Sequence, residues 1–172
     1  MVTLYLDEEE RESIDLDDVD TVEELRNKVG YYDVIYSDDL PDSFIDWLND
    51  SKESKSDNDQ ALTAVMAYHL ACDDGNQDGF DVWAFWSPDE VSAYSLDHEG
   101  LYDRFCGVYG CCVDSVKEYV MDMIETEYPD MSTNSMTYQA LCCVDFDIVQ
   151  RELELGGTHF LWDGGCYHVF YE

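Results

Sequence analysis

The chain has 172 residues, of which 45% are hydrophobic and 14% aromatic, so it holds enough apolar side chains to build a folded core. Forty-one acids stand against eight bases, which gives a formal net charge of −33. Eight scattered bases cannot form the basic patch that direct nucleic-acid or anionic-membrane binding requires, and the N-terminus lacks the basic region of a signal peptide.

The first 48 residues predict a small α+β module. Thr21 followed by Glu24 has the spacing of a capping box, and Gly30 is a typical C-terminal stop, so a helix is expected between them. The other expected elements of residues 1–48 are a strand over 2–6, an acidic loop or irregular edge over 8–20, a strand over 31–36, and a short helix capped by Ser43 and ending near residue 48.

Residues 49–60 are polar and rich in Ser, Asp and Lys, which is typical of a linker. A central helical module is expected over residues 61–100. Its elements are a helix over 61–71, a loop over 72–79, a short strand or buried segment over 82–86, and a helix that begins at Ser87-Pro88.

The C-terminal module is expected over residues 101–172. Gly107 and Gly110 make residues 101–112 ambiguous. A clear helix follows over 114–128, then a largely helical stretch over 138–155 and a hairpin over 160–171 around Asp163-Gly164-Gly165. The fold class predicted for the whole chain is α+β, as an elongated chain of two or three small α/β modules.

Acids recur on one side of the helix expected over residues 114–128. Asp114, Glu118, Asp122 and Glu125 are separated by steps of four, four and three, which keeps them on one helix face. An ordinary solvated face is the simplest interpretation, but such a face normally interleaves Lys and Arg with the acids, and here Lys117 is the only base. The candidate partner-binding acids are Asp114, Glu118, Asp122, Glu125, Glu127, Asp130, Glu152 and Glu154.

The charge is comparable with that of DNA. Duplex DNA carries one negative charge per ~1.7 Å of axis, so 33 charges correspond to roughly 56 Å of duplex, and two protomers to roughly 112 Å. One helix row supplies only one charge per ~6 Å. Imitation of DNA would therefore require several acidic rows, with carboxylates standing in for phosphates.

Seven cysteines, an odd number that includes the adjacent pairs 111–112 and 142–143, do not predict a disulfide framework. Reduced thiols in a cytosol are expected instead. The longest apolar stretch, over residues 61–72, is too short to span a membrane. The sequence predicts a cytoplasmic protein without cofactor or metal and without a catalytic motif.

The sequence offers two metal sites as alternatives. Residues 74–79 match positions 1, 3, 5 and 6 of an EF-hand loop, but Phe85 occupies position 12, where a bidentate Glu is needed. A zinc site could use His159, Cys166 and His168, or His69 with Cys72, although no paired-ligand knuckle is present. A turn, core cysteines and surface histidines are the simpler interpretations.

Three stretches carry distinctive patterns: residues 34–41, Phe105-x-Gly107-x-Tyr109, and residues 145–160. In this order, over about residues 20–172, they resemble the ArdA family of antirestriction proteins. Residues 34–41 resemble its first strand and turn, and Phe105-x-Gly107-x-Tyr109 resembles its F-x-G-x-Y motif before an acidic helix. The most specific match is to the family pattern D-Y-x-x-x-x-R-D-L-x-L-x-G-x-F. Its counterparts here are Asp145-Phe146, Arg151-Glu152-Leu153-Glu154-Leu155, Gly157-Thr158 and Phe160.

The resemblance implies a homodimer that imitates bent B-form DNA and occupies the DNA-binding groove of type I restriction–modification enzymes. It implies no catalysis and no cofactor, and it places the protein in a bacterial host cell. Two other interpretations stay open: an acidic inhibitor of another nucleic-acid-binding system, such as a CRISPR effector or a nucleoid protein, and a calcium-binding or halophilic protein whose acids serve another purpose.

Overall fold

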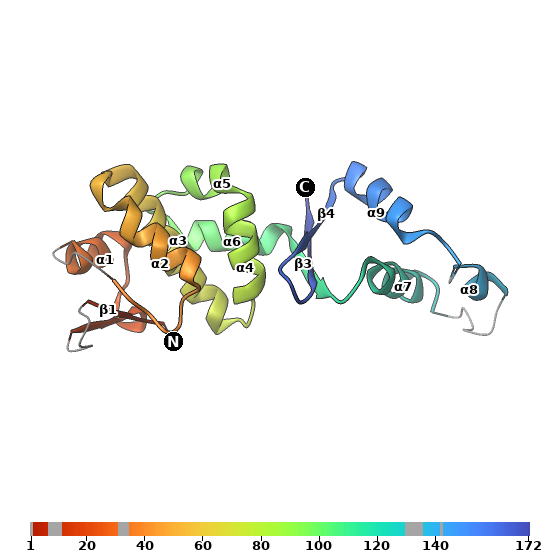
Figure 1. Cartoon of the computed structure of the whole chain (residues 1–172), viewed down its shortest axis with the longest axis horizontal. Helices are drawn as coiled ribbons and strands as arrows, with labels where there is room; N and C mark the ends of the chain where they lie inside the picture. The colour runs from red at the N-terminus through yellow and green to blue at the C-terminus, as the bar shows by residue number, and fades with distance from the viewer. Residues whose placement is uncertain (1, 7–11, 31–34, 130–135, 142) are drawn as a thin grey trace. The chain divides into compact units, whose positions relative to one another are not determined.

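The computed structural model describes residues 2–6, 12–30, 35–129, 136–141 and 143–172 (Figure 1). Its fold is α+β, as the sequence predicts. The helices and strands among these residues are β1 (Thr3–Tyr5), β2 (Ser13–Asp15), α1 (Val22–Val29), α2 (Asp42–Asp50), α3 (Lys55–Asp73), α4 (Gln77–Trp86), α5 (Pro88–Ala93), α6 (His98–Val108), β3 (Tyr109–Val113), α7 (Val116–Glu127), α8 (Met136–Leu141), α9 (Phe146–Leu155), β4 (Thr158–Trp162) and β5 (Tyr167–Tyr171), with short 3-10 helices η1 (Leu16–Asp18) and η2 (Ser51–Glu53).

The chain folds into two compact units, Met1–Gly107 (unit 1) and Val108–Glu172 (unit 2). This differs from the expected division into modules 1–48, 61–100 and 101–172 with a linker at 49–60. The first two modules share one core, because α1 and α2 both pack on α3. The expected boundary at residue 100 falls inside α6.

Unit 1 begins with a two-stranded antiparallel sheet in which Leu4 lies opposite Ile14. Strand β2 and η1 arise within residues 8–20, where the abundance of acids predicts a loop or an irregular edge. The reason is that Ile14, Leu16 and Val19 alternate with the acids and are buried. Of the strand expected over residues 31–36, positions 31–34 lie outside the described residues, and Tyr36 forms an isolated bridge with Tyr5.

Local capping signals place α1 as predicted. The hydroxyl of Thr21 accepts the backbone N–H of Glu24 at 3.2 Å, and the helix ends before Gly30. Helix α2 is longer than expected and begins after Pro41, one residue before the predicted cap Ser43. Pro88 lies at the first turn of α5, as the sequence predicts.

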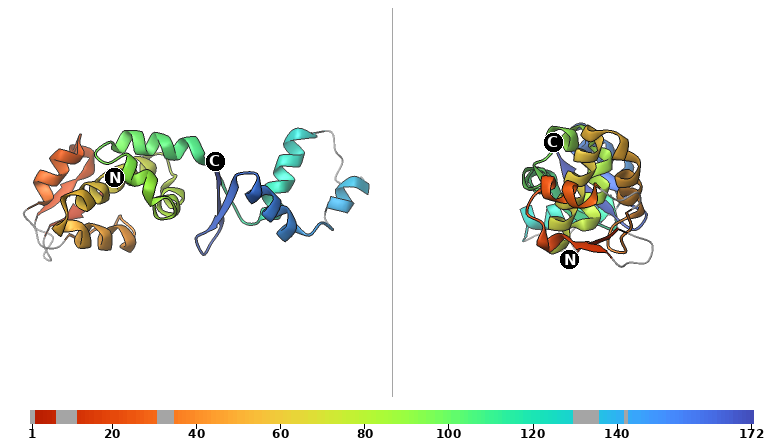
Figure 2. Two further views of the ribbon diagram at one scale, coloured as in Figure 1. Left: turned by 90° about the horizontal axis from the view of Figure 1, so that it is seen from above. Right: turned by 90° about the vertical axis from the view of Figure 1, so that its left-hand side faces the viewer.

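Helix α3 is the centre of unit 1, and its surroundings can be followed in Figures 1 and 2. Helices α1, α2, α4 and α5 all contact it. Its small residues between Ala61 and Ala71 are buried on several sides, which lets the neighbouring helices approach closely. The helix begins in the stretch expected to be a linker, because Ser54 caps it by accepting the N–H of Asp57.

Helix α4 occupies the segment where a short strand is expected over residues 82–86. Phe80, Trp83 and Ala84 are buried, and their spacing is that of one helix face. A run of apolar residues alone does not distinguish a buried strand from a buried helix. Here the aromatic neighbours decide: the ring of Phe80 packs edge-on against Phe105, with centroids 5.3 Å apart.

Unit 2 is built on a three-stranded antiparallel sheet in the order β3-β5-β4. The predicted hairpin is present, with β4 and β5 joined by a turn in which Gly164 has a φ of +103° that favours glycine. Helices α7 and α9 contact each other and the sheet. The helical stretch expected over 138–155 is divided into α8 and α9, because the side chain of Asp145 caps α9.

Among the described residues, no helix is both long and apolar enough to cross a lipid bilayer.

Candidate acidic interface

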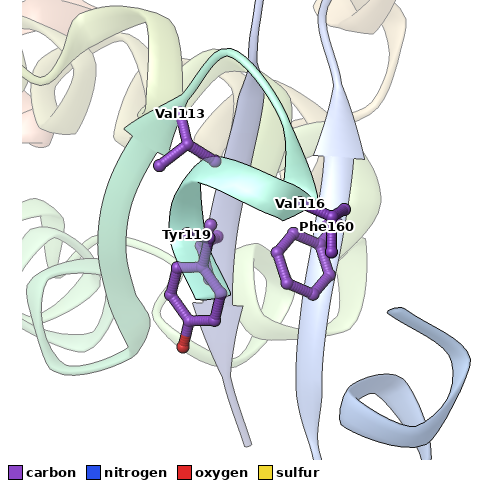
Figure 3. Close-up of a cluster of buried hydrophobic side chains, with 5 residues drawn as sticks. Val113, Val116, Tyr119 and Phe160 are labelled. Atoms are coloured by element: carbon purple, nitrogen blue, oxygen red, sulfur yellow. The ribbon is translucent and has the colours of Figure 1, made fainter. Parts of the chain in front are cut away.

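Buried contacts fix the orientation of α7. Val116 and Tyr119 point from the helix to Val113 on β3 and Phe160 on β4, as Figure 3 shows. The rings of Tyr119 and Phe160 meet edge to face, with centroids 5.3 Å apart. Because this side of the helix is held in the core of unit 2, the opposite side must face solvent.

The start of α7 is held by two reciprocal hydrogen bonds. The hydroxyl of Ser115 accepts the backbone N–H of Glu118 at 3.2 Å, and the carboxylate of Glu118 accepts the backbone N–H of Asp114 at 2.7 Å. The helix therefore begins at Val116, and Asp114 precedes it. Glu118 has a capping role in addition to its charge.

The predicted acids of this helix are exposed. Glu118, Asp122 and Glu125 all face solvent at steps of four and three residues, as do Asp114 before the helix and Glu127 at its end. Asp130 lies outside the described residues. The sequence thus predicts the acidic side of α7 correctly, and we refer to Glu118, Asp122 and Glu125 as the α7 row.

The predicted acids of α9 belong to the same unit, but they differ from each other. Glu152 is exposed, whereas Glu154 is half-buried and accepts a hydrogen bond from the side-chain amide of Gln150 at 2.8 Å. Helix α9 packs against α7, so the acids of the two helices belong to the same unit. That unit carries twelve acids and two bases.

A second acidic row lies on α2 and was missed by the sequence analysis. Asp42, Asp46 and Asp50 are exposed at steps of four, while Phe44 and Leu48 on the other side are buried. The same four-residue spacing that marks α7 is visible in the sequence. The helix expected between Ser43 and residue 48 contains only Asp46 of the three acids, so the sequence analysis does not predict the row. We refer to these three acids as the α2 row.

Three bases of unit 1, Arg26, Lys28 and Arg104, are paired with neighbouring acids. Arg104 lies 2.9 Å from Glu90, and Lys28 lies 3.1 Å from Glu24. These pairs neutralise acids within the unit. They leave the α2 row uncompensated by those bases.

A shallow groove of about 250 Å³ runs between β3 and α7, next to the α7 row. Its lining includes Cys111, Met123 and the carboxylates of Asp122 and Glu127. Burial, and to a smaller extent the charges of Asp122 and Glu118, raise the pKa of the Cys111 thiol. The thiol is therefore a local reporter of the field that the acids create.

The calcium alternative is not supported by the backbone. Helix α4 begins at Gln77, so Asp78, at position 5 of the supposed EF-hand loop, lies inside a helix. Asp74 at position 1 accepts a hydrogen bond from the hydroxyl of Tyr102 at 2.5 Å. The twelve-residue loop that would wrap a calcium ion is therefore not formed.

The zinc alternatives are rearranged by the fold. His69 lies 3.0 Å from Asp17, and His159 lies 3.3 Å from Glu172. Cys166 and His168 do come together, but with Cys112 and Asp163 as their neighbours. The D-G-G-C-x-H pattern of residues 163–168 contains three of these four side chains. Only the strand pairing could reveal Cys112.

Cys112 and Cys166 are joined by a disulfide, with their Cα atoms 6.3 Å apart. The expectation of reduced thiols throughout is therefore wrong for this pair. The sequence gives no disulfide signal, because the two cysteines are 54 positions apart and are brought together by the pairing of β3 with β5. Cys72, Cys106, Cys111 and Cys143 are free.

No family model, curated protein or solved structure matches this chain.

Proposed function

We propose that this protein is a DNA mimic that occupies the DNA-binding groove of a type I restriction–modification enzyme and so inhibits it. The observation that carries the proposal is the α7 row, whose acids are held outward by a buried opposite face. The α2 row repeats the arrangement in unit 1. The type I target comes from the resemblance to the ArdA family.

The mechanism is electrostatic and steric. The exposed carboxylates take the place of phosphates and bind the Lys and Arg residues that line the enzyme's groove. Successive acids in each row are separated by about 4.5–6 Å along the helix axis. One row is too sparse to imitate a duplex, so the proposal requires further rows, and each unit of this −33 chain carries one.

Like charges on one helix face repel each other, so the acidic rows lower the stability of their helices. Acids at i,i+4 on a helix destabilise it by roughly 0.2–0.5 kcal/mol per pair. Three such acids on α2, with only local compensation of charge elsewhere in unit 1, are easier to explain by recognition of a basic partner than by stability.

The test is an in vitro restriction assay with a purified type I enzyme, ATP and a plasmid that carries its site, titrated with this protein at two salt concentrations. We expect inhibition at near-stoichiometric ratios that is weakened by salt and relieved by excess DNA. Absence of inhibition by folded protein would overturn the assignment to type I enzymes. A CRISPR effector and a nucleoid protein would then be assayed as targets in the same way.

A matched pair of variants separates the acidic rows from total charge. The first neutralises the α7 row together with Glu127 at the end of the same helix: Glu118→Gln, Asp122→Asn, Glu125→Gln and Glu127→Gln. The control neutralises four exposed acids outside both rows: Asp38→Asn, Glu53→Gln, Glu99→Gln and Asp103→Asn. We expect the first variant to lose inhibition on the order of tenfold or more, and the control to lose much less. Equal losses would mean that only net charge matters and would contradict a defined acidic interface.

The proposal includes a homodimer. Ile148 and Leu155, on α9, are 61% and 74% exposed, and Val144 just before this helix is exposed as well. Exposed apolar side chains that gather on one surface often mark a site of protein–protein contact. We expect the protein to have the mass of a dimer in light scattering and Ile148→Glu to shift it to the monomer. A monomeric wild-type protein at assay concentrations would contradict this part.

A further inference from the structure

Four side chains that can ligate a metal meet at the end of the unit 2 sheet where the turn joins β4 to β5. In the antiparallel pairing of β3 with β5, Cys112 lies directly opposite His168, so both project from the same face of the sheet. The turn between β4 and β5 adds Asp163 and Cys166. Strand β3 thus supplies Cys112, strand β5 supplies His168, and the tight turn at Gly164 supplies Asp163 and Cys166.

Their ligand atoms converge. The Nε2 atom of His168 lies 2.9 Å from Oδ2 of Asp163 and 3.6 Å from Sγ of Cys166, and that Sγ lies 3.8 Å from the same Oδ2. The Sγ of Cys112 is bonded to that of Cys166 and completes the group. A tetrahedral zinc ion with ordinary bond lengths holds such atoms about 3.4–3.8 Å apart. Two of the three distances already lie at about these values.

The ligands are held by partners of their own. Oδ1 of Asp163 accepts the backbone N–H groups of Gly165 at 2.6 Å and Cys166 at 2.8 Å, which directs Oδ2 to His168. His168 is only 2% exposed, and its Nδ1 atom lies 3.2 Å from the hydroxyl of Tyr109. A hydrogen bond to the second ring nitrogen is the usual way in which a metal-binding histidine is oriented.

The same geometry disfavours a nucleophile relay. In a Cys–His–Asp relay the thiol and the carboxylate contact opposite nitrogens of the ring. Here the thiol of Cys166 and the carboxylate of Asp163 both face Nε2. Three different ligand types pointing at one position indicate a shared ion in place of proton transfer along a chain.

We propose that, in the reduced protein, Cys112, Cys166, His168 and Asp163 bind one zinc ion or a divalent cation of similar softness. Reduction by a dithiol transfers two electrons and two protons to the Cys112–Cys166 bond, and the reductant becomes its own disulfide. The cation then binds both sulfurs as thiolates, and two protons pass to water. The disulfide and the metal centre are thus alternative states that tie the same two strands. This inference is independent of the proposed function.

Cobalt is the probe. The protein is reduced with a phosphine under anaerobic conditions and titrated with Co²⁺. We expect one equivalent to produce the intense visible absorption of tetrahedral cobalt together with thiolate-to-cobalt charge transfer, and we expect Zn²⁺ to abolish both. The oxidised protein should give neither signal. Absence of the tetrahedral spectrum from reduced wild-type protein at one equivalent, or the same spectrum from oxidised protein, would overturn the proposal.

Matched variants locate the ion. Cys112→Ser and Cys166→Ser should each lose the charge-transfer absorption in part and weaken binding at least ~tenfold. Cys111→Ser, the next residue along β3 and on the opposite face, should bind as the wild type does. Tyr109→Phe, which removes only the hydroxyl beside His168, should weaken binding by about 10–100-fold. The assigned ligands would be contradicted if Cys111→Ser reduced the cobalt signal as strongly as Cys166→Ser does.

Discussion

The guanidinium of Arg26 on α1 lies 2.9 Å from the carboxylate of Asp59 in the first turns of α3, and the Asp59 side chain is only 9% exposed. A carboxylate is seldom this buried unless a base accompanies it. The pair joins α1 to the segment that composition alone marks as a linker. It is thus one of the contacts that make residues 1–107 a single unit.

Replacing Arg26 by Met should lower the free energy of unfolding by about 3–5 kcal/mol, because it leaves the buried charge of Asp59 without a partner. Urea denaturation followed by circular dichroism measures this. The matched control is Lys28→Met, which should change stability little, because the side chain of its partner Glu24 is 42% exposed. The double variant Arg26→Met/Asp59→Leu should recover much of the loss. Equal effects of the two single variants would contradict the role given to the buried pair.

Single neutralisations in the α7 row should each weaken inhibition of the restriction enzyme only slightly, because the binding energy is spread over many acids. Each lost contact should also reduce the salt dependence of binding, with the slope of log K against log salt falling by about one. Competition assays at several salt concentrations measure both quantities. One substitution that abolished inhibition without unfolding the protein would indicate a specific contact and argue against distributed mimicry.

Alkylation of Cys111 should be slow at pH 8, because burial and the charges of Asp122 and Glu118 disfavour its thiolate. In the double variant Glu118→Gln/Asp122→Asn the rate at Cys111 should rise, since the pKa of the thiol falls when the acids are neutralised. Mass spectrometry after iodoacetamide treatment reads each cysteine separately. The exposed thiol of Cys106 in unit 1 is the internal control and should not change. An unchanged Cys111 rate would mean that the field of the α7 row does not reach the groove.

Phe160→Ala should destabilise unit 2 by about 3–5 kcal/mol, because it opens a cavity beneath α7 and removes the edge-to-face contact with Tyr119. Hydrogen exchange should accelerate across residues 108–172, while α3 and α4 of unit 1 keep their protection, since they have a separate core. Inhibition of the restriction enzyme should fall with the loss of α7. Faster exchange throughout both units would show that they unfold together.

A thermal scan over a range of salt concentrations separates the DNA-mimic interpretation from the halophilic one. The charge of −33 predicts that added salt raises the melting temperature, because self-repulsion is screened. A protein with ordinary salt requirements should nevertheless stay folded at ~10 mM salt, where the Debye length is about 30 Å. Unfolding at that salt concentration would support the halophilic interpretation, in which the acids serve stability in brine.

The sequence by itself determined the features that depend on local chemistry. Thr21 and Glu24 mark the start of α1, and the Asp-Gly-Gly turn marks the β4–β5 hairpin, because capping and turn geometry need only neighbouring residues. The acidic side of α7 follows in the same way from the period of a helix. The α+β class is the sum of such signals.

Only the tertiary structure decided which polar residues are buried and which distant residues meet. Asp59 lies in a stretch whose composition predicts solvent exposure, and Arg26 from another helix makes its burial possible. The apolar run over 82–86 became helical because the aromatic rings around it are spaced for a helix. Cys112 reached Cys166 and His168 through strand register, which depends on long-range pairing that no local pattern encodes.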